Sequence, residues 1–350
     1  MQASFARGDL KTWGYDGHYA RIAATPETIL PGARTVVCVG MPYATPDVAA
    51  APLTGRVSNY AWSSDYHRRM KSILSEIASV IETNAGTGTT KIACDTAPLA
   101  ERAFAARAGL GWIGKHTNLI DPQFGSFVFL GEIVTTVEFD SDERLKKNCG
   151  SCRRCIDICP TGALRGDYTI DATRCISDLT QRTDGIPRAM RPFVGTWVWG
   201  CDLCQTICPP TQKAGFSARS ENSAISQDAA APSLVRLLRL RSSDFRRTFA
   251  PTAIGWRGAA VLRRNAAVAL GNALDRSTVP ALRDSLESDP HPMVRGHSAW
   301  ALGRIGSPAA IDALERGLGW ESSQAVREEI ASALEPFAAN SALDALERVK

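Results

Sequence analysis

Eight of the ten cysteines are spaced in the sequence so that their side chains could bind metal. Four of them form one run, three form a second, and Cys175 lies between the two runs. The first run is C-x2-C-x2-C-x3-C-P, the ligand spacing of bacterial two-cluster ferredoxins, in which the fourth cysteine serves the other cluster. The second run lacks its first member because position 198 is Val, and Cys175 is the obvious substitute. The sequence therefore predicts two [4Fe–4S] clusters, one on Cys149, Cys152, Cys155 and Cys208 and the other on Cys175, Cys201, Cys204 and Cys159.

Structural zinc and disulfides are the alternative explanations of these cysteines. Zinc sites favour two separated C-x2-C pairs and do not need the x3-C-P ending. Disulfides suit short secreted chains, whereas this chain has 350 residues and begins without a hydrophobic signal region or twin arginines. We therefore expect a cytoplasmic protein. Cys38 and Cys94 lie in apolar stretches and are expected to be buried small side chains.

Three segments of the region 1–140 carry groups that could act on a substrate, namely 60–67, 94–102 and 109–118. Asp95 stands where an apolar stretch meets a loop, which is a common place for catalytic groups. A carboxyl group partly buried there would keep its proton nearer neutral pH and could act as a general acid. The alternatives are that Asp95 and Asp65 cap helices, and that His67 and His116 are surface residues.

Helices and strands must position these groups, and periodicity predicts both types in residues 1–140. Strands are expected at 35–44, 91–98 and 126–139, and helices at 65–82 and 99–111. There is no GxGxxG or P-loop sequence, so a Rossmann-type nucleotide site is not supported. Residues 141–212 form the cysteine module, and the small polar residues of 213–230 are expected to be a linker.

Residues 231–350 contain a repeat. Val294-Arg295 recurs further along the chain as Val326-Arg327, and the stretch from Arg264 to Gly271 aligns with 295–303 after a one-residue adjustment. Each unit has two short helical segments, which predicts a HEAT-like stack in which neighbours bury apolar faces that one unit cannot cover.

The chain has a net charge of only +4, but residues 231–264 hold eight arginines against the single acid Asp244. Arginine makes bidentate phosphate contacts, and the aromatic rings of Phe245 and Trp256 nearby could stack on bases. The block predicts a nucleic-acid partner, although a solvated helical face is the alternative. The residues expected to contact the nucleic acid are Arg246, Arg247, Arg263 and Arg264.

Several stretches together resemble the epoxyqueuosine reductase family, which comprises cobalamin-dependent iron–sulfur enzymes that complete queuosine in tRNA. They are SDYH (64–67), CDTAPLAERAFAARAGLGWIGKHTNLI (94–120), GSFVFLGEI (125–133), CGSCRRCIDICPTGAL (149–164), RCISDLTQ (174–181) and WGCDLCQTICP (199–209). The resemblance runs from about residue 10 to the end. Its most specific part is the DTAPLAER…GLGWIGK stretch joined to the cysteine module.

The resemblance implies a multi-domain α+β fold. An α/β cobalamin-binding catalytic domain would span 1–140, a ferredoxin-like two-cluster module 141–212, a linker 213–230, and a HEAT-like α-solenoid with a basic tRNA-binding face 231–350. The implied reaction is reduction of epoxyqueuosine to queuosine at the wobble position of tRNA, with Asp95 as proton donor. The implied cobalamin contacts are Asp65, Asp95, Thr96, Trp112, Gly114, Lys115, Asn118, Ser177 and Asp202.

The chain departs from the family pattern at two places. Asp178 and Arg182 stand where relatives usually have an aromatic residue and an acid, and the chain begins later than most relatives, which leaves room for a missing N-terminal helix. Both departures concern the outer wall of the cofactor pocket. The expected partners are a tRNA and a low-potential electron donor protein, with no membrane, and we expect a monomer.

Two other functions compete with this interpretation. A corrinoid reductive dehalogenase shares the combination of one cobalamin and two clusters, but such enzymes carry twin-arginine signals and lack a HEAT-like tail. A non-catalytic electron-transfer scaffold would leave the region 1–140 without a role. Corrin absorption bands in the anaerobically purified protein would distinguish an enzyme from the scaffold.

Overall fold

The computed structural model describes residues 2–45, 48, 51–215 and 227–347 and divides into two compact units. The first unit lies within 1–47, 59–178 and 201–225, and the second within 48–58, 179–200 and 226–350. Residues 51–58 and 179–200 thus pack in the unit that contains the helical repeats, although the sequence analysis placed them in the first domain and the cysteine module. Much of the predicted linker, residues 216–226, lies outside the described residues.

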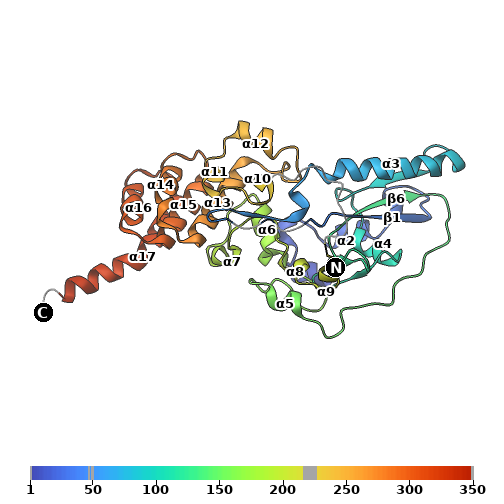
Figure 1. The fold of residues 1–350 in the computed structure, drawn as a ribbon, viewed down its shortest axis with the longest axis horizontal. Helices are drawn as coiled ribbons and strands as arrows, with labels where there is room; N and C mark the ends of the chain where they lie inside the picture. The colour runs from blue at the N-terminus through green and yellow to red at the C-terminus, as the bar shows by residue number, and fades with distance from the viewer. Residues whose placement is uncertain (1, 46–47, 49–50, 216–226, 348–350) are drawn as a thin grey trace. The chain divides into compact units, whose positions relative to one another are not determined.

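The first unit combines short helices with small antiparallel sheets (Figure 1). Its helices are α1 (Gln2–Ala6), α2 (Gly17–Ala23), α3 (Tyr66–Ala85), α4 (Glu101–Arg107), α5 (Arg154–Ile158), α8 (Leu203–Thr206) and α9 (Pro209–Ala214). Its strands are β1 (Thr35–Pro42), β3 (Thr90–Ala93), β4 (Trp112–Ile113), β5 (Leu119–Ile120) and β6 (Val128–Thr135). Short 3₁₀ turns lie at Lys11–Trp13, Pro26–Thr28, Asn59–Ala61 and Ala172–Arg174.

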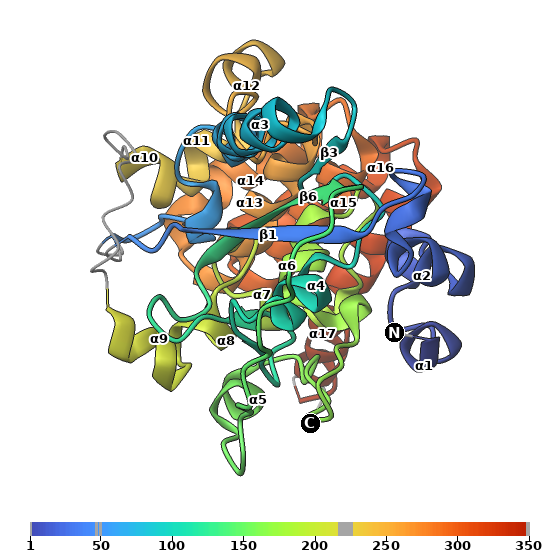
Figure 2. The ribbon, with the colours of Figure 1, turned by 90° about the vertical axis from the view of Figure 1, so that its right-hand side faces the viewer.

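Strand β6 is the centre of the main sheet, with antiparallel neighbours β1 and β3 on either side. Because successive side chains of a strand point to opposite faces, β6 divides its residues between two cores. Ile133 packs with Met70 and Leu74 of α3, whereas Leu130 packs on the other face with the small residues of α4. Helices α3 and α4 accordingly lie on opposite sides of the strands in Figure 1 and Figure 2.

Helix α3 can approach the sheet closely because β6 has a glycine beneath it. A Cβ atom at Gly131 would come within 2.8 Å of the Met70 side chain. The five predicted elements of residues 1–140 appear as β1, α3, β3, α4 and β6, with shorter strands than expected, whereas the other short elements of the first unit were not predicted. The hydrophobic face of α3 is turned to the core as expected.

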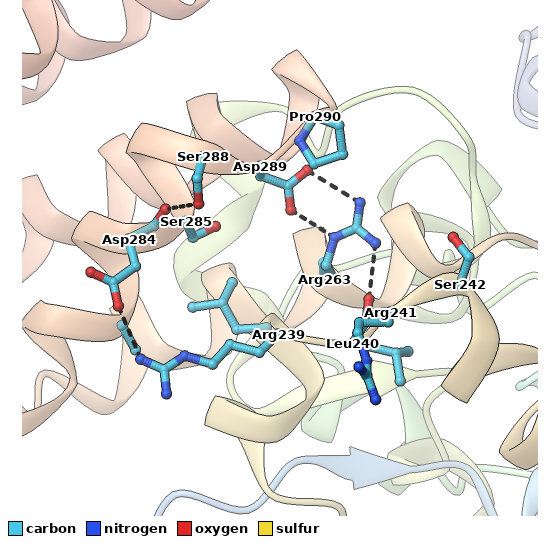
Figure 3. Close-up of a pocket in the computed structure, with 12 residues that line it drawn as sticks. Arg239, Leu240, Arg241, Ser242, Arg263, Asp284, Ser285, Ser288, Asp289 and Pro290 are labelled. Carbon is cyan, nitrogen blue, oxygen red and sulfur yellow. Dashed lines mark hydrogen bonds and ion pairs between the residues drawn. The ribbon is translucent and has the colours of Figure 1, made fainter.

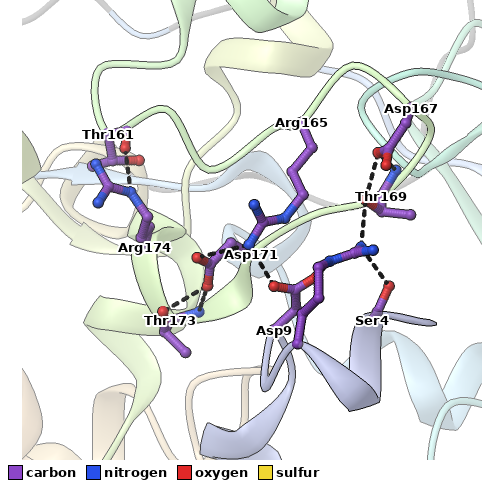
Figure 4. A network of polar contacts seen from close by, with 10 residues as sticks. Ser4, Asp9, Thr161, Arg165, Asp167, Thr169, Asp171, Thr173 and Arg174 are labelled. Atoms are coloured by element: carbon purple, nitrogen blue, oxygen red, sulfur yellow. Dashed lines mark hydrogen bonds and ion pairs between the residues drawn. The ribbon is translucent and has the colours of Figure 1, made fainter. Parts of the chain in front are cut away.

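The N-terminal segment braces the cysteine module through a buried carboxylate (Figure 4). Asp9 is 1% exposed and accepts hydrogen bonds from Arg7 and Arg165, while the amide N–H of Ala172 donates to its main-chain carbonyl. These side-chain bonds hold the pKa of Asp9 below its usual range, although burial opposes them. The turn that precedes Cys175 is therefore fixed within the first unit.

The second unit is mostly helical. Its helices are α7 (Arg191–Val194), α10 (Gln227–Ala230), α11 (Leu234–Leu238), α12 (Ser242–Thr248), α13 (Ala259–Ala273), α14 (Val279–Ser288), α15 (Pro292–Ile305), α16 (Pro308–Trp320) and α17 (Gln324–Glu347). Strands β2 (Arg56–Val57) and β7 (Trp197–Trp199) pair in parallel, and 3₁₀ turns occupy Arg188–Met190 and Arg276–Thr278. Helix α6 (Ile176–Gln181) begins in the first unit and ends in the second.

Helices α13, α15 and α17 pack in succession and form the inner row of the repeat stack (Figure 1). Two ion pairs occupy matching positions of successive repeats: Arg263 bonds Asp289 at 2.6 Å, and Arg295 bonds Glu321 at 2.7 Å. Arg263 is therefore the repeat equivalent of Arg295. The one-residue adjustment in the sequence alignment thus falls at its start, where Arg263 and not Arg264 corresponds to Arg295.

No helix in the described part of the chain is long and apolar enough to cross a membrane.

Candidate functional site

The charge of each cysteine thiol acts on the pKa of its neighbours, and these neighbours divide the eight thiols into two groups of four. The first group joins the run Cys149–Cys155 to Cys208: burial raises the pKa of Cys208 to about 11, and its neighbours Cys149 and Cys155 add to that rise. Burial also raises the pKa of Cys155, again with Cys149 and Cys152 as neighbours. Residues that are far apart in the sequence therefore lie close together.

The second group joins Cys159 and Cys175 to the start of the other run. Burial raises the pKa of Cys201, with further contributions from Cys175 and Cys159, and the pKa of Cys204 rises for the same reasons beside Cys175 and Cys201. All eight thiols are free of disulfides. Cys155 of the first group also adds to the rise in the pKa of Cys204, so the two groups adjoin each other. The division is that of a two-cluster ferredoxin, in which the fourth cysteine of each run belongs to the other group.

Lys115 ties the β4–β5 hairpin to the first cysteine group. Its ammonium donates to the main-chain carbonyls of Gly150 at 2.7 Å and Cys152 at 3.0 Å, and its main-chain N–H lies 3.4 Å from the sulfur of Cys149. Lys115, predicted to contact a cofactor, thus uses its charge to fix the loop that carries the first cysteines.

The hairpin itself is a tight turn that contains several predicted contact residues. Gly114 donates from its N–H to the carbonyl of Asn118, and Thr117 adopts a positive φ of 69°. Arg102 of α4 donates to the Thr117 carbonyl at 2.9 Å, which connects the turn to the helix that follows Asp95. The indole nitrogen of Trp112 is buried without a hydrogen-bond partner in the described structure.

Asp95, His67 and Asp65 form a polar group at the edge of the sheet. The Nδ1 atom of His67 lies 2.6 Å from the Asp65 carboxylate, and its Nε2 atom lies 3.4 Å from the Asp95 carboxylate. The hydrogen bond with Asp95, together with that to Asp65, raises the pKa of His67, although partial burial opposes the rise. Sequence reasoning had left His67 as a possible surface residue, and its link to both acids depends on the fold.

The two capping alternatives have different outcomes. Asp65 does cap α3, because its carboxylate accepts the main-chain N–H of His67. Asp95 does not cap α4, whose N-terminal cap is Ala100. The side chain of Asp95 is 60% exposed, so the partial burial expected from the sequence was wrong.

Two carboxyl groups lie beneath the Asp95 loop: Glu101, which is partly buried and belongs to the chemically rich segment 94–102, and Glu132, which sequence reasoning missed. Glu101 accepts the main-chain N–H of Asp95, which adopts a positive φ of 55°. Glu132 is fully buried on the α4 face of β6, and burial raises its pKa, with Glu101 adding to the rise. Burial raises the pKa of Glu101 as well. A lone acid in the apolar stretch FVFLGEIVTT was the available signal for Glu132.

The other predicted cofactor contacts lie in different places. Thr96 is next to Asp95, and its N–H donates to the carbonyl of Cys94 at 2.6 Å. The N–H groups of Ser177 and Asp178 point at the sulfur of Cys175 and offset the rise that burial causes in its pKa. Asp202 is buried and accepts the N–H of Asn59 at 2.7 Å, so its carboxylate is engaged within the first unit.

Two arginines of the basic block of the second unit are paired with aspartates (Figure 3). Arg263 lines a cavity of about 520 Å³ and pairs with Asp289, and its side chain is only 11% exposed. Arg239 pairs with Asp284 at 3.0 Å. These aspartates follow the block in sequence, which is why the local charge count missed them.

The prediction that Arg264 contacts the nucleic acid was wrong. Its side chain is 0% exposed and its guanidinium is used on main-chain carbonyls, so it is not available to a phosphate in this structure. Arg246 and Arg247 of α12 are exposed, although Arg247 also pairs with Asp244 at 2.7 Å. The predicted nucleic-acid residues therefore divide into two surface residues and two internal ones.

Comparison with protein families matches three parts of the chain. Residues 24–96 match the family described as epoxyqueuosine reductase QueG, DUF1730. Residues 148–211 match a 4Fe-4S double cluster binding domain, and residues 257–335 match HEAT repeats.

Curated relatives extend the similarity over most of the chain. An epoxyqueuosine reductase of Bacillus cereus is 35% identical over 277 residues, which are 77% of this chain and 72% of the relative. An epoxyqueuosine reductase of Escherichia coli K12 is 36% identical over 285 residues, which are 80% of this chain and 75% of the relative.

Solved structures agree with the whole fold. A crystal structure of an epoxyqueuosine reductase with a tRNA-Tyr epoxyqueuosine-modified stem loop has a TM-score of 0.84 and 33% identity, covering 96% of this chain and 92% of that one. Another, from Bacillus subtilis and with its catalytic aspartate loop swung out of the active site, has a TM-score of 0.87 and 32% identity, covering 95% and 89%.

Proposed function

This chain belongs to the epoxyqueuosine reductase family, and from that membership we propose that it reduces epoxyqueuosine to queuosine at the wobble position of tRNA. The observation that carries the proposal is the agreement, over 96% of the chain, with a relative solved together with an epoxyqueuosine-modified tRNA stem loop. Neither a dehalogenase nor a scaffold is favoured by these relatives.

We propose that each group of four cysteines holds one [4Fe–4S] cluster. The double-cluster domain matched at 148–211 supports iron–sulfur clusters in this chain. The crossed grouping of the thiols supports the particular ligand sets, with Cys208 completing the first group and Cys159 the second. Four thiols in each group fit the ligand requirement of a four-iron cluster.

We propose the cobalamin site at the edge formed by Asp65, His67, Asp95 and the β4–β5 hairpin. The outward-facing polar groups of this edge and the unsatisfied indole N–H of Trp112 are of the type that the amide side chains of a corrin would contact. Lys115 connects the hairpin to the first cysteine loop, so the group would lie beside the electron supply. When bound, cobalamin would supply the two-electron reduction of the substrate.

The protein residues at this edge would supply the protons. Converting an epoxide to an alkene takes two electrons and two protons and releases the oxygen as water. Asp95 is exposed and would donate a proton to the oxygen that leaves the ring. His67 lies 3.4 Å from Asp95 and is itself held by Asp65, so it would return a proton to Asp95, which would then donate the second proton as the oxygen leaves as water. Solvent would restore both protons before the next turnover. The clusters deliver their electrons one at a time.

We propose that Arg246 and Arg247 contact the tRNA backbone. Both lie on α12 with exposed side chains, and arginine suits phosphate because its planar donors match two oxygens at once. Arg263 and Arg264 are left out of this proposal because one is paired with Asp289 and the other is buried.

The test is turnover with defined components. Anaerobic protein with restored iron and added cobalamin would be incubated with a chemical reductant and tRNA carrying epoxyqueuosine, and the nucleosides then identified by mass spectrometry. We expect queuosine to form only with the complete mixture and corrin bands to remain after gel filtration. A fully loaded protein that leaves epoxyqueuosine unchanged would contradict the proposal.

A further inference from the structure

Residues 179–200 form a long excursion between two cysteines of the second group. Cys175 precedes this segment by a few residues, and Cys201 follows it directly. The ends of the segment are joined, because the N–H of Gly200 donates to the hydroxyl oxygen of Thr180 at 2.9 Å. Closing a loop of this length costs conformational entropy unless the chain is anchored elsewhere.

The anchor is a row of three residues on the inner helices of the repeat stack. Asn265 lies on α13, His297 on α15 and Glu329 on α17, and equal intervals of sequence separate them, so they occupy the same position of successive repeats. Such a row presents one continuous face to the segment 179–200.

Each member of the row bonds a different part of the segment. The amide nitrogen of Asn265 donates to the carbonyl of Thr180 at 2.8 Å and to that of Val198 at 2.7 Å, and so holds both ends at once. His297 accepts the N–H of Ile186 at 3.1 Å. Glu329 pairs with Arg191 at 2.8 Å and also with Arg188.

Arg264 completes the anchor beside Asn265. It is fully buried and directs its guanidinium at the main-chain carbonyls of Leu179, Thr180, Arg182 and Asp184. It also bonds the side-chain oxygen of Asn265 at 2.7 and 2.9 Å. A buried guanidinium whose donors are satisfied in this way fixes the backbone it binds, because losing any one bond leaves a buried polar group unpaired.

We propose that Arg264 and the row Asn265, His297 and Glu329 are positioning residues for the second [4Fe–4S] cluster. This rests on the cluster assignment within the proposed function. The repeats hold both ends of the segment 179–200. Cys175 and Cys201 flank these ends in the chain, so the repeats would restrict the positions of their backbone. Groups that contact the metal ligands, without binding the metal themselves, affect how tightly the metal centre is held and its reduction potential. The repeat stack would therefore serve the electron path as well as any RNA.

The test compares two variants with a matched control. Asn265→Asp keeps the size of the side chain and the contact with Arg264 but loses both donations to the segment. Arg264→Gln removes most of the carbonyl contacts. Arg295→Gln is the control, because Arg295 is a repeat arginine in a buried pair with Glu321 that does not touch residues 179–200.

Iron content, reduced-state paramagnetic resonance and the rate of bleaching in air would be measured on folded, anaerobically reconstituted protein. The parent should hold about eight irons, from two four-iron clusters. We expect Asn265→Asp and Arg264→Gln to lose one cluster signal and about half of the iron, or to bleach in two phases with one accelerated at least several-fold. Arg295→Gln should keep both clusters.

A double-variant experiment assigns the effect to one cluster. In a Cys175→Ala background, which lacks the second cluster, Asn265→Asp should cause no further loss of iron. If it does cause one, or if folded Asn265→Asp and Arg264→Gln keep both clusters with unchanged potentials and bleaching rates, the proposal is wrong. A parent that holds both clusters but leaves epoxyqueuosine unchanged would contradict the proposed function alone, because the iron measurements do not depend on turnover.

Discussion

The Asp95 edge and the Asn265 row treat their polar side chains in opposite ways. Asp95 is 60% exposed, adopts a positive φ, and its carboxylate lies 3.4 Å from the ring of His67. Asn265 is 0% exposed and uses its amide on both Arg264 and two main-chain carbonyls. The Asp95 edge keeps its carboxylate accessible and has a strained backbone. In the Asn265 row, the polar groups that are buried are satisfied by hydrogen bonds.

Under the proposed function, this difference separates Asp95, which would take part in the reaction, from residues that fix the position of the chain. Strained backbone and an accessible carboxylate persist where function requires them and the surroundings enforce them. Buried, fully bonded polar groups instead specify one arrangement of the chain. Substitutions at the two regions should therefore have different effects. At the Asp95 edge, activity should fall without a loss of stability. At the Asn265 row, the anchoring of residues 179–200 and the retention of the second cluster should fall first, and activity should fall only as a consequence.

Asp95→Asn should give the largest effect. If Asp95 is the general acid, the variant should lose about 10²–10⁴-fold in turnover because an amide cannot donate the proton. Melting temperature, iron and cobalamin content should not change, since the side chain is mostly exposed. Asp140→Asn is the control, as an exposed aspartate in the same unit. Turnover of Asp95→Asn within a few-fold of the parent would remove the distinction between the two regions.

Arg263→Gln should have the next largest effect, and on stability. Removing the guanidinium leaves the Asp289 carboxylate buried without its partner, which costs about 3–5 kcal/mol. Arg239→Gln is the matched control: the pair of Arg239 with Asp284 is largely exposed and is worth about 0–1 kcal/mol. Calorimetric melting of both variants measures the difference. Equal melting temperatures would show that the repeat ion pair does not hold the stack.

Local sequence predicted the elements well because their signals are local. The apolar runs and periodic helix of the first unit appear where the pattern placed them. The cysteine spacing predicted iron–sulfur clusters, which the double-cluster domain matched at 148–211 supports, and the crossed ligand sets stay a prediction. The packing of 51–58 and 179–200 with the repeats could not be predicted in this way. It depends on bonds such as Asn265 to Val198, which no local pattern encodes.

Charge was the least predictable property. Residues 231–264 have a strong local excess of arginine. Arg239 and Arg263 nevertheless form ion pairs with aspartates that come later in the chain. Arg264 donates hydrogen bonds to main-chain carbonyls. At the Asp95 edge, Glu101 and Glu132 are contributed by separate elements and meet only in the fold. A count of charges along the sequence cannot see either effect.

Arg246→Gln combined with Arg247→Gln tests the surface part of the basic block. If both contact phosphates, tRNA binding should weaken, and the slope of log K against log salt should fall by up to about two units. The melting temperature should hardly change because both side chains are exposed. Arg316→Gln, in an exposed pair outside the block, is the control. An unchanged salt slope would mean that the RNA docks elsewhere.

Glu132→Gln should have the smallest effect of these variants at pH 5, and one that grows as the pH rises. Burial raises the pKa of Glu132 in the folded chain, so folding takes up a proton once the pH exceeds the usual range of a glutamate. The folded state therefore loses stability as pH rises from that range to the raised pKa, by about 1.4 kcal/mol for each unit of difference. Glutamine cannot ionise, so the variant should melt at a higher temperature than the parent at pH 8 and at nearly the same temperature at pH 5. If the melting temperature of the variant falls with pH as steeply as that of the parent, another group is responsible for the pH dependence.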